Sequence, residues 1–173
     1  MEKMIDREKI YDGRVVTLVK DQVELDDGTR SVREVVLHPG AVCIAVKDDD
    51  HYLLVKQYRY AAGEELLEFP AGKLEPGEDP LEAIIRETRE ETGYKIKDIV
   101  CHGYIYPTCG YSSERIYLYS ASTDTYAGTD FDEDERITLY RYTLSEIEKL
   151  VRENKIVDGK TLSLLYHLRS NND

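Results

Sequence analysis

Three acidic side chains recur at helical spacing in one short stretch of the chain, at Glu87, Glu90 and Glu91. At about 100° per residue, these positions fall within one narrow sector of a helix. Like charges at this spacing destabilise a helix by roughly 0.2–0.5 kcal/mol per pair unless a cation lies beside them. Hard oxygen ligands that converge on one point suit Mg²⁺ or Mn²⁺. The alternative is a solvated acidic face, which is ordinary for a Glu-rich helix taken alone.

The helix that would position these carboxylates has clear start and stop signals. Asp79 can cap free N–H groups, Pro80 suits the first helical position, and Gly93 suits the stop. The sector beside the glutamates is predicted to be the buried stripe of the helix and comprises Leu81, Ile84, Ile85 and Thr88.

A longer pattern surrounds the glutamates and changes the balance between these two interpretations. It runs Gly72, five residues, Glu78, seven residues, Arg86-Glu87, two residues, Glu90-Glu91, one residue and Gly93. The pattern resembles the box of the Nudix family, and all its polar and glycine positions are matched. Thr88 and Tyr94 stand where the family has aliphatic residues, which we expect to affect packing and not metal binding. The resemblance implies an α/β/α sandwich with a mixed sheet, and a hydrolase of nucleoside diphosphates linked to a second moiety.

Beyond the box, most of the chain is similar to the ADP-ribose pyrophosphatases of this family. The stretches that carry this resemblance are 33–36, 38–41, 55–59, 68–73 and 110–114. The resemblance implies that Arg33, Arg59 and Glu114 contact the substrate. The planar guanidinium of an arginine can donate two parallel hydrogen bonds to phosphate oxygens, and a carboxylate can accept hydrogen bonds from ribose hydroxyls. The alternative for either arginine is an ordinary surface charge.

A second acidic cluster occupies residues 130–136. Taken alone, it would be a solvated charge run. The resemblance places a metal-binding glutamate and a candidate catalytic base in this loop, and these map most naturally to Glu135 and Glu133. A loop that carries the base could also close over the bound substrate and exclude other water.

The resemblance also implies a ligand set and a reaction. The metal ligands would be the Ala71 carbonyl, Glu87, Glu91 and Glu135, with Glu90 beside them as an additional ligand. The catalytic residues would be Glu133, Glu135 and Glu90. The cofactor would be Mg²⁺, with Mn²⁺ as a possible substitute, and it would lower the pKa of a bound water. For ADP-ribose the products would be AMP and ribose 5-phosphate. Glu78 and Arg86 are expected to be structural, with Arg86 pairing with carboxylates to fix the loop against the helix.

Two alternatives remain at this point. The same metal site would serve another nucleoside diphosphate sugar or NADH. A non-catalytic protein that binds ADP-ribose as a signal would share the fold but would have no need of the carboxylates, which are all present here.

Composition narrows the class of partner. The chain has 173 residues, a formal net charge of −12 and a pI of about 4.8. This charge argues against nucleic-acid or anionic-membrane binding, because both need a basic footprint. No apolar run approaches a membrane span. The cysteines are odd in number and lack metal-type spacing, so we expect free thiols in a reducing cytoplasm, at Cys43, Cys101 and Cys109.

The chain order predicts a small N-terminal β subdomain, 1–40, before a Nudix domain, 41–173. Residues 14–25 and 29–37 are predicted to form a hairpin around the turn 26–28. The same hairpin could instead be the first two strands of one sheet. Further strands are expected at 41–46, 52–60, 96–106, 115–121 and 137–142. Thr143 and Glu146 are predicted to form a capping box for a helix to about 154, and Asp158 to cap a last helix that ends near 169.

The hairpin also bears on assembly. A two-stranded unit is marginal by itself and must pack on something. ADP-ribose pyrophosphatases that resemble this chain commonly exchange N-terminal strands, which implies a homodimer in which Arg33 serves the neighbour's substrate. The hairpin could equally fold back on its own core.

Overall fold

A computed structural model describes residues 1–131 and 136–170 of the chain. The molecule consists of two compact units. One unit contains Met1–Gly40 together with Tyr106–Arg115, and the other contains Ala41–Ile105 together with Ile116–Asp173. The segment Tyr106–Arg115, which lies between two predicted strands, belongs to the first unit.

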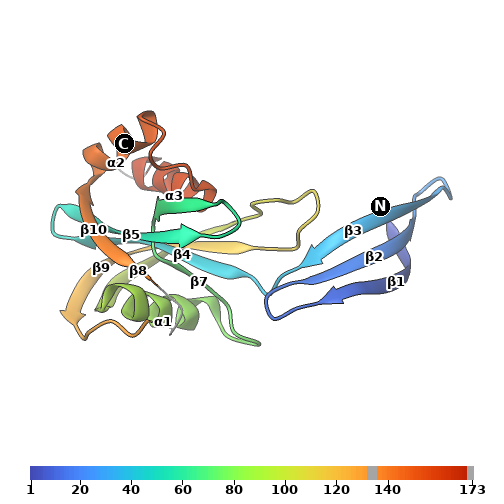
Figure 1. Cartoon of the computed structure of the whole chain (residues 1–173), viewed down its shortest axis with the longest axis horizontal. Coiled ribbons are helices and arrows are strands. Elements are labelled where there is room, and N and C mark those ends of the chain that lie inside the picture. Colours follow the sequence, from blue (N-terminus) through green and yellow to red (C-terminus); the bar gives the residue numbers. More distant parts are fainter. Residues whose placement is uncertain (132–135, 171–173) are drawn as a thin grey trace. The chain divides into compact units, whose positions relative to one another are not determined.

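The first unit is built on a three-stranded antiparallel sheet in the order β1-β2-β3 (Figure 1). The strands are β1 (Lys3–Asp12), β2 (Thr17–Glu24) and β3 (Arg30–Leu37). Strands β2 and β3 confirm the predicted hairpin, and Gly28 adopts a φ of 82° in its turn, a conformation that favours glycine. Strand β1 was not predicted, because all its side chains are exposed and it lacks an alternating apolar pattern.

Few side chains are buried in this first unit. Val19 and Val23 of β2 are buried, and the Asp21 carboxylate between them is also covered. Arg7 donates to both Asp21 oxygens, from Nε at 2.8 Å and from Nη2 at 2.7 Å. These hydrogen bonds lower the pKa of Asp21. The segment Tyr106–Arg115 attaches to β3 through Val36, whose N–H donates to the Tyr111 carbonyl at 2.8 Å.

The second unit contains a mixed seven-stranded sheet with the strand order β10-β5-β4-β9-β8. Strands β4 and β9 run parallel, whereas β6 and β7 pair antiparallel with β5 and β4. The strands are β4 (Ala41–Asp48), β5 (His51–Arg59), β6 (Glu64–Glu68), β7 (Ala71–Lys73), β8 (Tyr94–Ile105), β9 (Ile116–Tyr126) and β10 (Thr138–Thr143). The five strands expected in this region are confirmed.

Helices cover both faces of this sheet, with α1 (Pro80–Thr92) on one face and α2 (Leu144–Arg152) and α3 (Gly159–Ser170) on the other (Figure 1). Side chains of β4 alternate between the two faces of the sheet, so this one strand contributes to two apolar cores. Cys43 and Ala45 pack with α2 and α3, whereas Val42 and Ile44 pack with α1. The predicted α/β/α sandwich with a mixed sheet is therefore confirmed.

The predicted caps are present at each helix start. Asp79 accepts from the Leu81 N–H at 2.8 Å, and Gly93 ends α1 with a φ of 78°. Thr143 and Glu146 form the expected capping box of α2. At α3, Asp158 accepts from the Thr161 N–H at 2.9 Å.

The buried face of α1 differs from the predicted stripe. Leu81 and Ile85 are 44% and 45% exposed, whereas Glu91 is only 2% exposed. The face that packs on the sheet is rotated toward the glutamates, through Ala83, Ile84 and the short Thr88. The buried Thr88 hydroxyl has a hydrogen-bond partner, because it donates to the Ile84 carbonyl at 2.6 Å. The prediction for Leu81 and Ile85 was wrong because apolar character alone did not show which side would meet the sheet.

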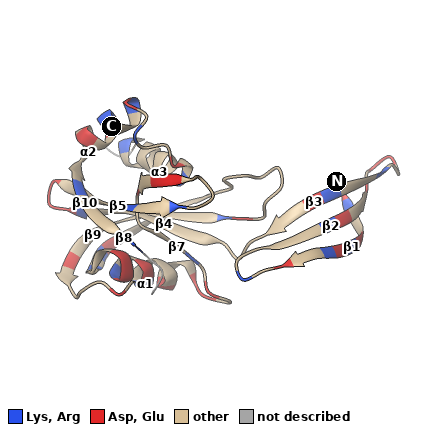
Figure 2. Ribbon diagram, in the orientation of Figure 1, with Lys and Arg blue, Asp and Glu red and all other residues tan. Residues whose placement is uncertain are grey.

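Helix α1 carries both acidic and basic residues (Figure 2).

In the part of the chain that the structure describes, no helix is long and apolar enough to cross a membrane.

Candidate active site

The site begins at the tight packing of strand β7 against helix α1. A Cβ atom at Gly72 would lie 1.8 Å from Cδ of Glu87 and 2.0 Å from its Oε1. No real side chain tolerates such contacts, so only glycine lets the Glu87 carboxylate lie against the backbone at this position. The first glycine of the sequence pattern thus makes room for one of its glutamates.

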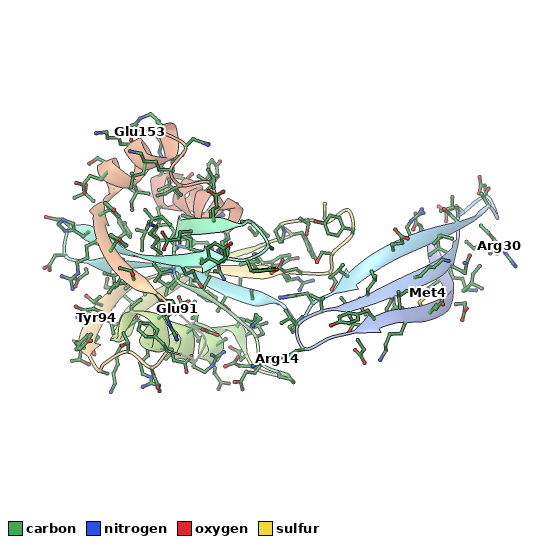
Figure 3. The ribbon with its side chains drawn as sticks, viewed as in Figure 1. Met4, Arg14, Arg30, Glu91, Tyr94 and Glu153 are labelled. Atoms are coloured by element: carbon green, nitrogen blue, oxygen red, sulfur yellow. The ribbon has the colours of Figure 1, made fainter. Side chains whose placement is uncertain are left out.

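Glu91 is held against the adjacent residue of the same strand. Its Oε2 accepts a hydrogen bond from the Ala71 N–H at 3.0 Å. Figure 3 labels Glu91 on α1. Glu87 and Glu91 are one helical turn apart, and both carboxylates are brought to the Ala71–Gly72 backbone. The contact also explains how a carboxylate can be buried here, because a buried polar group needs a hydrogen-bond partner.

Arg86 links the remaining glutamates of the pattern. Its guanidinium donates to both Glu78 oxygens, at 2.9 and 3.0 Å, to Glu87 Oε1 at 2.8 Å and to Glu90 Oε2 at 3.0 Å. It also donates to the Lys73 carbonyl at 3.2 Å. Arg86 therefore joins the loop before α1 to the helix itself, which confirms the expected pairing of Arg86 with carboxylates.

Arg86 and its carboxylate partners stabilise each other's charged forms. The hydrogen bond from Arg86 lowers the pKa of Glu78, and the surrounding carboxylates, Glu78 first, raise the pKa of Arg86. The repulsion expected among three close glutamates is thus offset by a guanidinium that lies between two of them.

The donor set fits a hard divalent cation. Glu87, Glu91 and the Ala71 carbonyl would supply oxygen ligands only, as Mg²⁺ and Mn²⁺ prefer. Within residues 1–131 and 136–170, no group of three Asp, Glu, His or Cys side chains is gathered as an ion site. Among the described residues, two acidic side chains and one backbone carbonyl would contribute to such a site, and Arg86 bonds to both Glu87 and Glu90.

Arg59, at the end of β5, lies in the same unit as this cluster. Its Nε donates to Glu68 Oε1 at 2.7 Å. Burial lowers the pKa of Arg59, but its hydrogen bond to Glu68 and the charges of Glu68, Glu91 and Asp158 raise it on balance.

The acidic loop after β9 is attached to α1 at its first residue. The Asp130 N–H donates to the Glu90 carbonyl at 3.0 Å, and the Asp130 carboxylate pairs with Arg89 at 3.0 Å. The loop thus starts beside the C-terminal end of the glutamate-bearing helix. Glu133 and Glu135 lie outside the described residues.

Arg33 and Glu114 both belong to the first unit. Arg33 of β3 donates to Glu2, from Nε at 3.0 Å and from Nη2 at 2.5 Å. Glu114 lies 3.8 Å from His38 Nδ1, measured from its Oε1. The described structure thus gathers Ala71, Glu87, Glu90, Glu91 and Arg59 in one unit and Arg33 and Glu114 in the other.

Sequence reasoning missed the partners of Arg59. Glu68 is fully buried, and Lys160 of α3 donates to its second oxygen. A usable signal existed for Glu68, because it is a charge between two apolar residues, Leu67 and Phe69, in a strand. No local signal pointed from Glu68 to Lys160, since 92 positions separate them.

Comparison with known proteins places this geometry in context. A family model described as "NUDIX domain" matches residues 36–164. The chain is 40% identical to the methanol dehydrogenase activator of Bacillus methanolicus and 37% identical to the ADP-ribose pyrophosphatase of Bacillus subtilis (strain 168). Each alignment covers 97% of this chain and 92% of the relative. A crystal structure of an ADP compounds hydrolase superposes with a TM-score of 0.87 at 25% identity, covering 98% of this chain and 92% of that one.

Proposed function

The chain belongs to the Nudix family of hydrolases, and we propose that it cleaves the diphosphate bond of ADP-ribose to give AMP and ribose 5-phosphate. Two carboxylates held against one loop carry this proposal: Glu87 lies against Gly72, and Glu91 accepts from the Ala71 N–H. Such an arrangement serves a cation that a diphosphate also binds. The relatives named ADP-ribose pyrophosphatase support the choice of substrate.

We propose Mg²⁺ as the cation, with Mn²⁺ as a substitute. Glu87, Glu91, the Ala71 carbonyl and Glu135 would hold it. When bound, a divalent cation neutralises the diphosphate and lowers the pKa of a coordinated water. Arg86 would keep Glu87 and Glu90 in place while they face the substrate, because it already bonds to both.

The chain's own groups would divide the remaining tasks. Glu133 is proposed as the general base that takes the proton of the attacking water, and Glu90 as a further carboxylate beside the metal ligands. Arg59 would hold a phosphate oxygen and the charge that develops on the leaving phosphate. Arg33 and Glu114 are proposed to bind the rest of the substrate.

A substrate panel tests this function. ADP-ribose, other nucleoside diphosphate sugars and NADH would each be incubated with Mg²⁺, with Mn²⁺ and with chelator, and released monophosphate would be measured. We expect the highest kcat/KM for ADP-ribose and no turnover with chelator. A higher kcat/KM for another compound would reassign the substrate, and binding of ADP-ribose without turnover would identify a non-catalytic sensor.

The acidic loop can be tested by separating two roles. Glu133→Gln is expected to lower kcat by about a hundredfold or more with little change in KM, because a base acts only in the transition state. Glu135→Gln is expected instead to raise the Mg²⁺ concentration needed for half-maximal rate. Asp134→Asn, a matched loss of charge between them, should leave both parameters unchanged. If all three variants titrate with Mg²⁺ like the wild type and keep full kcat, the loop is a solvated charge run.

We also propose a cytoplasmic homodimer. Support for the dimer comes from β1, which forms an edge of its sheet and exposes the apolar residues Met4, Ile5, Ile10 and Tyr11. An exposed edge strand is a template for pairing with another chain. The three free cysteines support a reducing compartment.

Sedimentation at micromolar concentration checks the dimer. The full chain is expected to sediment as a dimer, and a chain lacking residues 1–40 as a monomer with weaker affinity for ADP-ribose, since Arg33 is lost with the segment. A full-length monomer that binds ADP-ribose tightly would rule out the exchange of N-terminal strands.

A further inference from the structure

A row of alternating charges, fully buried at Glu68, joins helix α3 to strands β6 and β5. Arg59 donates from Nε to Glu68 Oε1 at 2.7 Å, and Lys160 donates to Glu68 Oε2. Lys160 also donates to Asp158 Oδ1 at 3.0 Å. The Glu68 side chain is 1% exposed and the Lys160 side chain 12% exposed. The four groups cancel one another's charge, which is the condition for burying them.

A contribution to folding stability is a weak explanation for the presence of these four charged side chains. Charged groups lose their hydration when they are buried, and apolar side chains of similar volume often do as well or better in the same place. A row of ion pairs fixes the orientation of each polar group, whereas an apolar cluster does not. The member whose direction bears on the proposed chemistry is Arg59.

Arg59 uses only one of its three nitrogens within the row. Its Nε binds Glu68, and its side chain is 37% exposed. Across the residues that the structure describes, no hydrogen bond is recorded for its Nη1 or Nη2. These two terminal nitrogens form the fork with which arginine binds phosphate.

Lys160 binds the Glu68 oxygen that a doubly bonded arginine would also use. A carboxylate beside an arginine commonly takes two parallel hydrogen bonds from it, one to each oxygen. Here Arg59 contacts one oxygen of Glu68 through Nε, and Lys160 contacts the other oxygen.

The first turn of α3 also holds the strand segment that leads to Ala71. The Phe69 N–H donates to the Thr161 hydroxyl oxygen at 2.9 Å, and the Thr161 hydroxyl donates to Asp158 at 2.6 Å. Helix α3 therefore fixes two successive residues, Glu68 and Phe69, through Lys160 and Thr161. A small movement of α3 would be transmitted to both Glu68 and the backbone before Ala71.

We propose that Lys160 is a positioning residue: by occupying one oxygen of Glu68, it keeps the two terminal nitrogens of Arg59 available for a diphosphate oxygen of the substrate. This inference rests on the proposed function for its catalytic consequence, but not for its structural claim. Lys160 itself touches no reacting group.

Lys160→Met tests the structural claim without any substrate. Methionine keeps the length of the side chain and removes the cation, so Arg59 is expected to turn and bind both Glu68 oxygens. In ¹⁵N-detected NMR of the full chain, the Nη–H resonances of Arg59 should then become separately resolved, because rotation of the guanidinium is restrained. Lys160→Arg restores a cation and should return the wild-type spectrum. Lys155→Met, which removes an exposed lysine paired with Glu153, is the matched control and should leave Arg59 unchanged.

Kinetics test the consequence for the reaction. Lys160→Met is expected to raise KM for ADP-ribose by about tenfold, the factor for losing one hydrogen bond to a charged group, with a smaller change in kcat. In an Arg59→Lys background, the same substitution should change KM by less than about twofold, because the two residues act in one chain of contacts. The Mg²⁺ dependence should stay that of the wild type.

The outcomes separate this inference from the proposed function. A lower melting temperature with unchanged Arg59 resonances and unchanged KM would overturn the positioning role and leave a purely structural one. If the wild type does not hydrolyse ADP-ribose, the proposed function fails, and the NMR comparison of Lys160→Met with Lys160→Arg still decides whether Lys160 sets the direction of Arg59.

Discussion

Glu91→Gln is expected to lower kcat for ADP-ribose by on the order of a thousandfold, because one anionic ligand contributes several kcal/mol of charge stabilisation at a metal site. The fold should survive. A glutamine has nearly the same volume, and its side-chain oxygen can still accept from the Ala71 N–H, which now donates to Glu91 at 3.0 Å. Single-turnover and steady-state rates at saturating Mg²⁺, with the melting temperature, would measure the effect.

A matched control exists on the same helix. Glu82 lies in the exposed first turn of α1, so Glu82→Gln removes an equal charge without touching the Ala71–Gly72 loop. It should keep wild-type kcat. Near-wild-type turnover of Glu91→Gln would remove Glu91 from the metal site, whatever the behaviour of the control.

Gly72→Ala is expected to lower activity while leaving the stability of the fold nearly unchanged. The added methyl group would meet only the far end of a flexible side chain, with Cδ of Glu87 at 1.8 Å and both of its oxygens at 2.0 and 2.2 Å. Glu87 can swing away at little cost to the fold, but it then leaves its place beside the loop. We expect kcat to fall by about a hundredfold or more, while the melting temperature changes little.

Gly159→Ala provides the comparison, because nothing lies within 4 Å of a Cβ built at Gly159. It should leave kcat and KM unchanged. The measurements are kcat, the Mg²⁺ concentration at half-maximal rate and the melting temperature of both variants. Full activity in Gly72→Ala would mean that Glu87 is not needed where the structure places it.

Local signals were sufficient for the helices and most strands. The caps at Asp79 and Thr143 were predicted correctly, because a cap depends on residues a few positions apart. The pairing of Arg86 with carboxylates, which the family resemblance implied, is present in the contact with Glu78. Glu87 and Glu91 were proposed as metal ligands from their spacing on one helix, whereas the Ala71 carbonyl and Glu135 were added only through the family resemblance.

Features that depend on distant residues could not be predicted. Strand β1 is held by backbone pairing with β2, and its exposed side chains carry no periodic signal. The burial of Glu91 in place of Ile85 is decided by the loop at Ala71 and not by hydrophobicity. The row from Arg59 to Lys160 joins three separate elements, so no short pattern describes it.

The contacts of α3 also have a consequence for synthesis of the protein. Phe69 and its partner Thr161 are 92 positions apart. At about 5–20 residues per second, a ribosome adds α3 roughly 5–18 s after strand β6. During that interval the glutamate helix can already form, since its caps are local, but Glu68 has no lysine and Phe69 has no hydroxyl acceptor. The nascent chain therefore acquires the glutamates of α1 first and the contacts of α3 with Glu68 and Phe69 last, when the C-terminal helix docks.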